Sequence, residues 1–142
     1  MSNTVATAVL ALAAYFVGSI PSGVLLARIF TGRDVRDAGS GNIGAANVSR
    51  MAGMGVGSLV LVGDALKGLV PVLIGRAAGL TFFELDIVAG VAVLGHDFSA
   101  FLKLKGGKGV ATTIGVALAL APAPAAAAAV AWLLILGISR VS

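Results

Sequence analysis

A glycine-rich, polar segment at residues 39–50 carries the first group of residues that could do chemistry. Small residues such as Gly41 let the backbone turn sharply and expose its N–H groups, which is a geometry that binds an anion, most often a phosphate. Ser40, Asn42 and Asn47 add neutral hydrogen-bond donors, and Arg50 adds a planar charged group that suits phosphate oxygens. The same composition is typical of a flexible loop, and the pattern alone favours neither interpretation.

A second basic segment, with the sequence KGGKG at residues 105–109, lies directly before an apolar stretch. It resembles half of a nucleotide-binding phosphate loop, but the glycine spacing differs, and Gly109 stands where such loops have a magnesium-binding hydroxyl. The sequence therefore gives little support to an ATPase. By itself the segment is more typical of a basic turn that touches anionic lipid head groups. Both segments together could enclose two phosphates if they lie on one side of a membrane.

His96 is the only histidine, so no other side chain has an ordinary pKa near neutrality. Many acyltransferases pair a histidine with an aspartate five positions later, but that position is Phe101 here, and the dyad is absent. A lone histidine in a helix is more often a packing residue than a general base. These 142 residues contain no cysteine, which excludes a thiolate nucleophile and a cysteine-based metal site.

Asp64 and Lys67 interrupt an apolar run and are three residues apart, so they share one face of a helix. In lipid such a pair must face protein or water. A structural pair that ties helices together is the preferred interpretation, ahead of a proton pathway.

The elements that must position these residues are membrane helices. Of the 142 residues, 58% are hydrophobic and only 11% are charged, and a soluble domain of this size cannot bury so much apolar surface. The net charge of +4 alone could suggest nucleic acid, but the basic residues form short clusters between apolar runs, and one Trp and one Tyr offer little for base stacking. The sequence predicts an all-α, polytopic helical bundle in a lipid bilayer, with no nucleic-acid partner.

About five apolar runs have the composition of membrane-spanning helices. Pro21 lies inside the first run and should bend it, so that a neighbouring helix or a Ser hydroxyl must satisfy the carbonyl that is freed. The fourth run is short. Residues 31–53 and 103–109 are expected to be loops, and the chain is expected to form a single domain over residues 1–142. The predicted spans are 5–29, 56–74, 87–102, 110–120 and 125–138.

Lys and Arg concentrate in or beside the two expected loops, whereas the opposite connection offers Arg76 alongside Glu84 and Asp86. Because positive residues are retained on the cytoplasmic side, both loops are predicted to be cytoplasmic and the N-terminus external.

The order and spacing of these signals resemble one family, the bacterial glycerol-3-phosphate acyltransferases that use acyl phosphate as donor. Neither glycine-rich segment would be specific alone, but the set is. The matching residues are Gly18-Ser19-Ile20-Pro21-x-Gly23, Asp34-x-Arg36, Gly39 to Ala45, Asn47, Arg50, Asp64-x-x-Lys67-Gly68, Gly95-His96 and Lys105 to Thr112.

The resemblance implies a multi-pass protein of the bacterial inner membrane that transfers a fatty acyl group from acyl phosphate to the 1-hydroxyl of glycerol 3-phosphate. The product would be lysophosphatidic acid, in the first step of phospholipid synthesis. No metal, cofactor or acyl-carrier protein is implied. The residues to which it assigns substrate and phosphate contacts are Ser40, Gly41, Asn42, Asn47, Arg50, Gly106, Gly107 and Lys108, with Lys105 and His96 as supporting residues.

Two features depart from the family pattern. Ala46 stands where the family usually has Thr, which removes one hydroxyl. Family members also continue past residue 142 through further helices to a third cytoplasmic segment, so we expect these 142 residues alone to be inactive or nearly so. The alternatives from other classes are a small anion channel or transporter subunit, and a non-catalytic membrane fragment.

Overall fold

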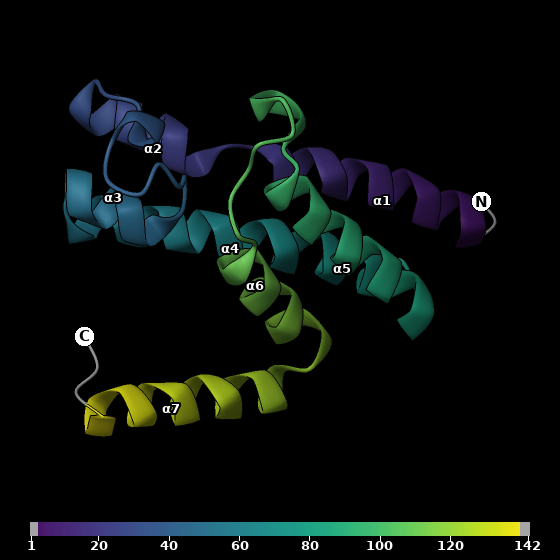
Figure 1. Ribbon diagram of the computed structural model, residues 1–142. Coiled ribbons are helices and arrows are strands. Elements are labelled where there is room, and N and C mark those ends of the chain that lie inside the picture. The colour runs from purple at the N-terminus through teal and green to yellow at the C-terminus, as the bar shows by residue number, and fades with distance from the viewer. Residues whose placement is uncertain (1–2, 140–142) are drawn as a thin grey trace.

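The computed structural model describes the backbone of residues 3–139 and the side chains of these residues except 129 and 132–139. Every regular element in this part of the chain is helical, as predicted (Figure 1). The elements are α1 (Asn3–Ser19), α2 (Ser22–Thr31), the 3₁₀ helix η1 (Val35–Asp37), α3 (Ala45–Ala52), α4 (Met54–Ala77), α5 (Phe82–Asp97), the 3₁₀ helix η2 (Ala100–Leu102), α6 (Val110–Leu120) and α7 (Pro122–Ser139).

Three stretches of the described chain are long and apolar enough to cross a bilayer, namely Asn3–Thr31, Met54–Ala77 and Phe82–Leu102. They correspond to the first three predicted spans. Large apolar side chains on these helices, such as Leu12 and Ile74, are exposed, as expected of surfaces that face lipid.

The fourth predicted span is short, and the fifth lies in a longer helix that is described mainly by its backbone. α6 has 11 residues, so it rises about 16 Å and crosses only about half of a hydrocarbon core of about 30 Å. α7 contains the fifth predicted span, 125–138, most of whose side chains lie outside the described residues.

The first span is broken at Ile20 and Pro21, which separate α1 from α2. Proline has no backbone N–H, and Ile20 and Pro21 lie outside both helices, so the carbonyl of Ile20 is bonded outside the regular helical pattern and accepts from the N–H of Ser22 at 3.0 Å. Lys67 of α4 donates a hydrogen bond to this carbonyl, and it also donates to Ser22 Oγ at 2.9 Å. The carbonyl that Pro21 leaves without its helical donor, that of Val17, accepts from the N–H of Ile20 at 3.2 Å, so the predicted donor from a neighbouring helix is found at the carbonyl of Ile20 instead.

α4 lies at the centre of the fold and contacts α1, α2, α3, α5 and α6 (Figure 1). Glycines allow the closest helix approaches. A methyl group at Gly68 of α4 would overlap the backbone of α6, and one at Gly115 of α6 would overlap the backbone of α4. Small residues at such contacts are typical of membrane helices, because they let the backbones come close together.

The segment 31–53 differs from the expected loop, because it contains η1 and α3. Two apolar residues of this segment, Val35 and Val48, are fully buried, and they pack with Val24 of α2 and Val60 of α4. A helix of eight residues is too short to be stable alone, so packing against α2 and α4 holds α3 in place. Residues 38–44 are thereby held between two anchored ends.

Candidate active site

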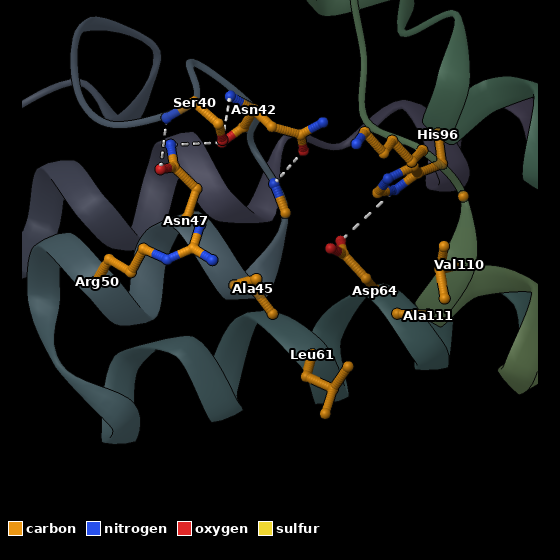
Figure 2. Close-up of a pocket in the computed structure, with 14 residues that line it drawn as sticks. Ser40, Asn42, Ala45, Asn47, Arg50, Leu61, Asp64, His96, Val110 and Ala111 are labelled. Atoms are coloured by element: carbon orange, nitrogen blue, oxygen red, sulfur yellow. Dashed lines mark hydrogen bonds and ion pairs between the residues drawn. The ribbon is translucent and has the colours of Figure 1, made fainter. Parts of the chain in front are cut away.

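A cavity of about 560 Å³ lies where the two glycine-rich segments meet α4 and α5. Figure 2 shows that Arg50 approaches it from α3, whereas Asp64 and His96 face each other at another part of its wall. The structure therefore brings together residues that are up to 71 positions apart in the sequence, from Ser40 to Ala111. The polar side chains that line it include Ser40, Asn42, Arg50, Asp64, His96 and Lys108.

Asn47 organises the first segment. Its side chain is 3% exposed, and its Oδ1 accepts a hydrogen bond from the N–H of Ser40 at 3.1 Å. Its Nδ2 lies within hydrogen-bond distance of three backbone carbonyl oxygens, those of Val35 at 3.1 Å, Ala38 at 3.0 Å and Asn42 at 2.9 Å. Within the described residues, the amide of Asn47 is thus engaged by the backbone of residues 35–42 (Figure 2).

The turn that follows is formed by Asn42, whose Oδ1 accepts a hydrogen bond from the N–H of Gly44 at 2.8 Å. Such a turn is a common local structure for asparagine. Gly41 has a φ of 69°, in the left-handed region that favours glycine, and its N–H donates to Ala38 O at 3.0 Å. The hydroxyl of Ser40 accepts a hydrogen bond from the N–H of Asn42 at 3.5 Å, and the side chain of Asn42 extends from the turn toward the His96 side of the pocket (Figure 2).

In the second segment, the resemblance assigned substrate or phosphate contacts to Gly106 and Gly107, but the N–H groups of both glycines bond to the end of α5. The N–H of Gly106 donates to Asp97 O at 2.9 Å, and the N–H of Gly107 donates to His96 O at 3.0 Å. These bonds satisfy carbonyls at the end of α5, which have no partners within the helix. A methyl at Gly106 would overlap His96 O, and one at Gly107 would overlap His96 Nε2. The two glycines therefore allow the segment to dock against the end of α5.

Two cations of the cavity differ from the other basic residues nearby. Arg28 and Arg36 both pair with Asp34, at 2.6 Å and 2.7 Å. Hydrogen bonds and charge from Arg36, with help from Arg28, hold the pKa of Asp34 well below its usual range. Arg50 and Lys108 form no ion pair within the described part of the chain. Their charges remain available to an anion in the cavity.

The inner wall of the cavity contains a buried polar cluster. Asp64 Oδ1 lies 2.6 Å from Lys67 Nζ and 3.7 Å from His96 Nδ1, and it also accepts a hydrogen bond from Ser22. The pair connects α4 to the break between α1 and α2, which confirms the structural interpretation of Asp64 and Lys67. His96 is 5% exposed, and its Nδ1 has no hydrogen-bond partner among the described residues.

Another wall of the cavity is apolar. It contains Leu61 of α4 and Val110 and Ala111 of α6. Leu61 is 48% exposed and Val110 is 65% exposed, on helices whose outer faces are apolar. The cavity thus joins two cationic, polar segments to a surface that suits a hydrocarbon chain.

Comparisons with known proteins agree with this geometry. The sequence pattern of the family described as glycerol-3-phosphate acyltransferase matches residues 8–142. The chain belongs to this acyltransferase family. The glycerol-3-phosphate acyltransferase of Syntrophotalea carbinolica is 51% identical over 109 residues, and that of Myxococcus xanthus is 49% identical over 137 residues. A crystal structure of PlsY (YgiH), an integral membrane glycerol 3-phosphate acyltransferase in its glycerol 3-phosphate form, has 41% sequence identity and a TM-score of 0.86.

The family members are longer than the matched chain. The alignment covers 76% of this chain and 56% of the Syntrophotalea protein, and 96% of this chain and 71% of the Myxococcus protein. It covers 92% of this chain and 66% of the PlsY structure. The described fold therefore corresponds to a little over half, and up to about two thirds, of these acyltransferases.

The cavity gathers many of the site residues predicted from the sequence and leaves others outside. Ser40, Asn42, Asn47, Arg50, His96 and Lys108 line it. Gly41, Lys105, Gly106 and Gly107 are described but do not belong to its lining. Within the described residues, no group of three or more His, Asp or Glu side chains could hold a metal ion.

Asp64 was not among the predicted site residues, although it lines the cavity. Its signal in the sequence was an acid inside an apolar span, which is costly in a membrane and often functional. Asp97 was not among the predicted site residues either. Its Oδ1 is buried and has no hydrogen-bond partner among the described residues.

Proposed function

We propose that this protein transfers a fatty acyl group from acyl phosphate to glycerol 3-phosphate, giving lysophosphatidic acid and inorganic phosphate. One observation carries the proposal: Arg50 and Lys108, which lack ion-pair partners in the described chain, line the same cavity as Leu61 and Val110. Such a cavity suits two phosphates beside an acyl chain. The solved relatives in glycerol 3-phosphate and lysophosphatidic acid forms support this choice of acceptor and product.

The reaction needs little covalent catalysis from the protein, because an acyl phosphate is a mixed anhydride with a good leaving group. The acceptor hydroxyl attacks the acyl carbonyl carbon, a C–O ester bond forms, and the bond between that carbon and the phosphate oxygen breaks. The hydroxyl proton passes to a phosphate oxygen of one of the substrates and ends on the leaving phosphate, which departs as hydrogen phosphate. Holding the two anions close together and neutralising their charge should supply most of the rate.

Arg50 and Lys108 are assigned to the phosphates in this scheme. Each approaches the cavity from a different segment, so one cation can serve each anion or both can share one. Ser40 and Asn42 add neutral donors on the side of Arg50, and the apolar wall of Leu61 and Ala111 receives the beginning of the acyl chain.

The protein is proposed to lie in the bacterial inner membrane with the segments 31–53 and 103–109 on the cytoplasmic side. Basic residues favour this orientation, and it gives the cavity access to soluble glycerol 3-phosphate. The location of both segments at one cavity supports a shared side.

The test is an assay with acyl phosphate and labelled glycerol 3-phosphate, on membranes in which these 142 residues are followed by the C-terminal segment of a longer family member, because the 142 residues alone are expected to be inactive or nearly so. Labelled lysophosphatidic acid should form with acyl phosphate and not with acyl-CoA or acyl-carrier protein as donor, and membranes with Lys108→Ala serve as the control. Absence of product with every donor, together with phosphate flux into liposomes, would favour the transporter alternative.

A further inference from the structure

Lys108 follows directly after a glycine that contacts an aromatic ring. The backbone of Gly107 lies so close to His96 that a methyl group there would overlap Nε2 and come within 3.0 Å of both Cδ2 and Cε1. The N–H of Gly107 also donates to the carbonyl of the same histidine at 3.0 Å. Both the backbone and the ring of His96 therefore touch the residue that precedes the cavity cation.

The ring itself is fixed from the other side. His96 is 5% exposed, and its Nδ1 faces Asp64 Oδ1 at 3.7 Å (Figure 2). Asp64 is in turn held by Lys67, which also donates to the carbonyl of Ile20 at the break between α1 and α2. A continuous set of contacts thus runs from this break through the buried pair and the ring to Gly107.

The geometry points to His96 as a positioning residue that acts through Lys108: its ring is the support on which Gly107 rests, and it sets where the Lys108 ammonium lies in the cavity. The ring edge that carries Nε2 and Cε1 supplies the support, and Nδ1 on the opposite side of the ring lies 3.7 Å from Asp64 Oδ1. His96 need not gain or lose a proton for this role.

Two substitutions of His96 test the roles of the two ring edges separately. His96→Asn keeps a polar group near the position of Nδ1 and removes the atoms at Nε2 and Cε1, whereas His96→Gln keeps a side chain long enough to reach Gly107. We expect His96→Asn to lower kcat/KM for acyl transfer by about 10- to 100-fold, the cost of moving a binding group by about 1 Å. His96→Gln should stay within about threefold of the wild type, since its side chain retains the support.

A change at the glycine gives the complementary test. Gly107→Ala should impair activity because its methyl group overlaps the ring, and combination with His96→Asn should restore part of the activity, since the shorter side chain makes room. Gly106→Ala is the matched control. Its methyl group overlaps the backbone carbonyl of His96, so no substitution of the ring should rescue it.

Action through Lys108 is tested in a Lys108→Ala background. There His96→Asn should cause little further loss, because the group that it positions is gone. Equal losses in both backgrounds, or equal activities of the Asn and Gln variants, would overturn the assignment. Global destabilisation would instead lower activity in both backgrounds and would lower the unfolding temperature.

Hydrogen exchange of residues 103–109 gives a readout that does not require turnover. Exchange of the backbone amides of residues 106 and 107 should be faster in His96→Asn than in His96→Gln. In the double variant His96→Asn, Gly107→Ala, this exchange should be slower than in His96→Asn alone. The kinetic part of the test rests on the proposed acyl transfer, whereas this part does not. A wild-type protein without turnover but with these exchange differences would refute the proposed function and leave the support of Gly107 by His96 intact. Unchanged exchange in all variants would refute the support itself.

Discussion

Asn47 Oδ1 accepts a hydrogen bond from the backbone N–H of Ser40 at 3.1 Å, which joins the helix α3 to the glycine-rich turn before it. The nitrogen of the same amide reaches the carbonyls of Val35, Ala38 and Asn42. One buried side chain therefore sets the shape of the loop that presents Ser40 and Asn42 to the cavity.

Asn47→Asp is expected to disrupt this loop, although its size is unchanged. The carboxylate cannot donate to the three carbonyls, and each buried polar group left without a partner costs about 1–3 kcal/mol. We expect a lower unfolding temperature in detergent and a loss of most acyl transfer. Asn42→Asp is the matched control for the unfolding temperature alone, because the Asn42 side chain accepts from Gly44 through Oδ1 and can still do so as a carboxylate. Wild-type stability of Asn47→Asp would contradict this role.

Arg50→Ala and Lys108→Ala should each remove most activity while membrane insertion stays intact. Loss of one charge-assisted phosphate contact in a shielded site costs about 2–4 kcal/mol, or about 30- to 1000-fold in rate. Arg36→Ala offers a comparison at a cation that is already paired with Asp34. Losses below threefold for both cavity variants would place the phosphates elsewhere.

The buried pair of Asp64 and Lys67 is expected to show strong coupling. Lys67→Met leaves the carboxylate without a counter-charge and removes a donor from the carbonyl of Ile20, so it should destabilise the protein by about 3–5 kcal/mol. The double variant Asp64→Asn, Lys67→Met should recover part of this loss, because no lone charge remains. Unfolding temperatures of the two single variants and the double variant provide the measurement, and additive losses would show that the two residues are not coupled.

Asp34 should keep its charge under acidic conditions in the folded protein. Its folded pKa lies below the unfolded value of about 3.9, so its contribution to stability is present above that pH and is lost as the pH falls through the folded pKa. The carboxyl carbon chemical shift of Asp34 should titrate at lower pH in the folded protein than in a peptide of residues 31–38. Arg36→Ala should move the folded titration back toward the peptide value. Identical titration in protein and peptide would contradict the ion pairs.

The proposed orientation can be tested by labelling single introduced cysteines, because these 142 residues contain no cysteine of their own. Arg33→Cys and Lys105→Cys place thiols at exposed positions of the two segments, and Ala78→Cys places one at the connection between α4 and α5. In intact cells an impermeant thiol reagent should label the third and spare the first two. Labelling of Arg33→Cys and Lys105→Cys without permeabilisation would invert the orientation.

Much of this protein is determined by its sequence alone. Long apolar runs have few stable states other than membrane helices, because each backbone polar group in lipid needs a partner within its own segment. Pro21 lacks an N–H wherever it lies, which favours a break in the first span, although Pro71 is accommodated inside the continuous helix α4. Arg50 and Lys108 are two of several basic residues in or beside the loops, and the motifs that contain them are distinct enough to indicate the family.

Only the tertiary structure decided how the small and polar residues of these motifs are used. Glycine serves equally to expose an N–H and to let two backbones touch, and Gly106 and Gly107 do the second, against a helix end that lies ten residues earlier. Asn47 has the same donors whether it faces a ligand or its own loop, and the burial of α3 against α4 turns it toward the loop. Asp64 and His96 meet across 32 positions in the chain, because α4 and α5 pack together. Local spacing holds no information about such partners, since their distance depends on how the helices pack.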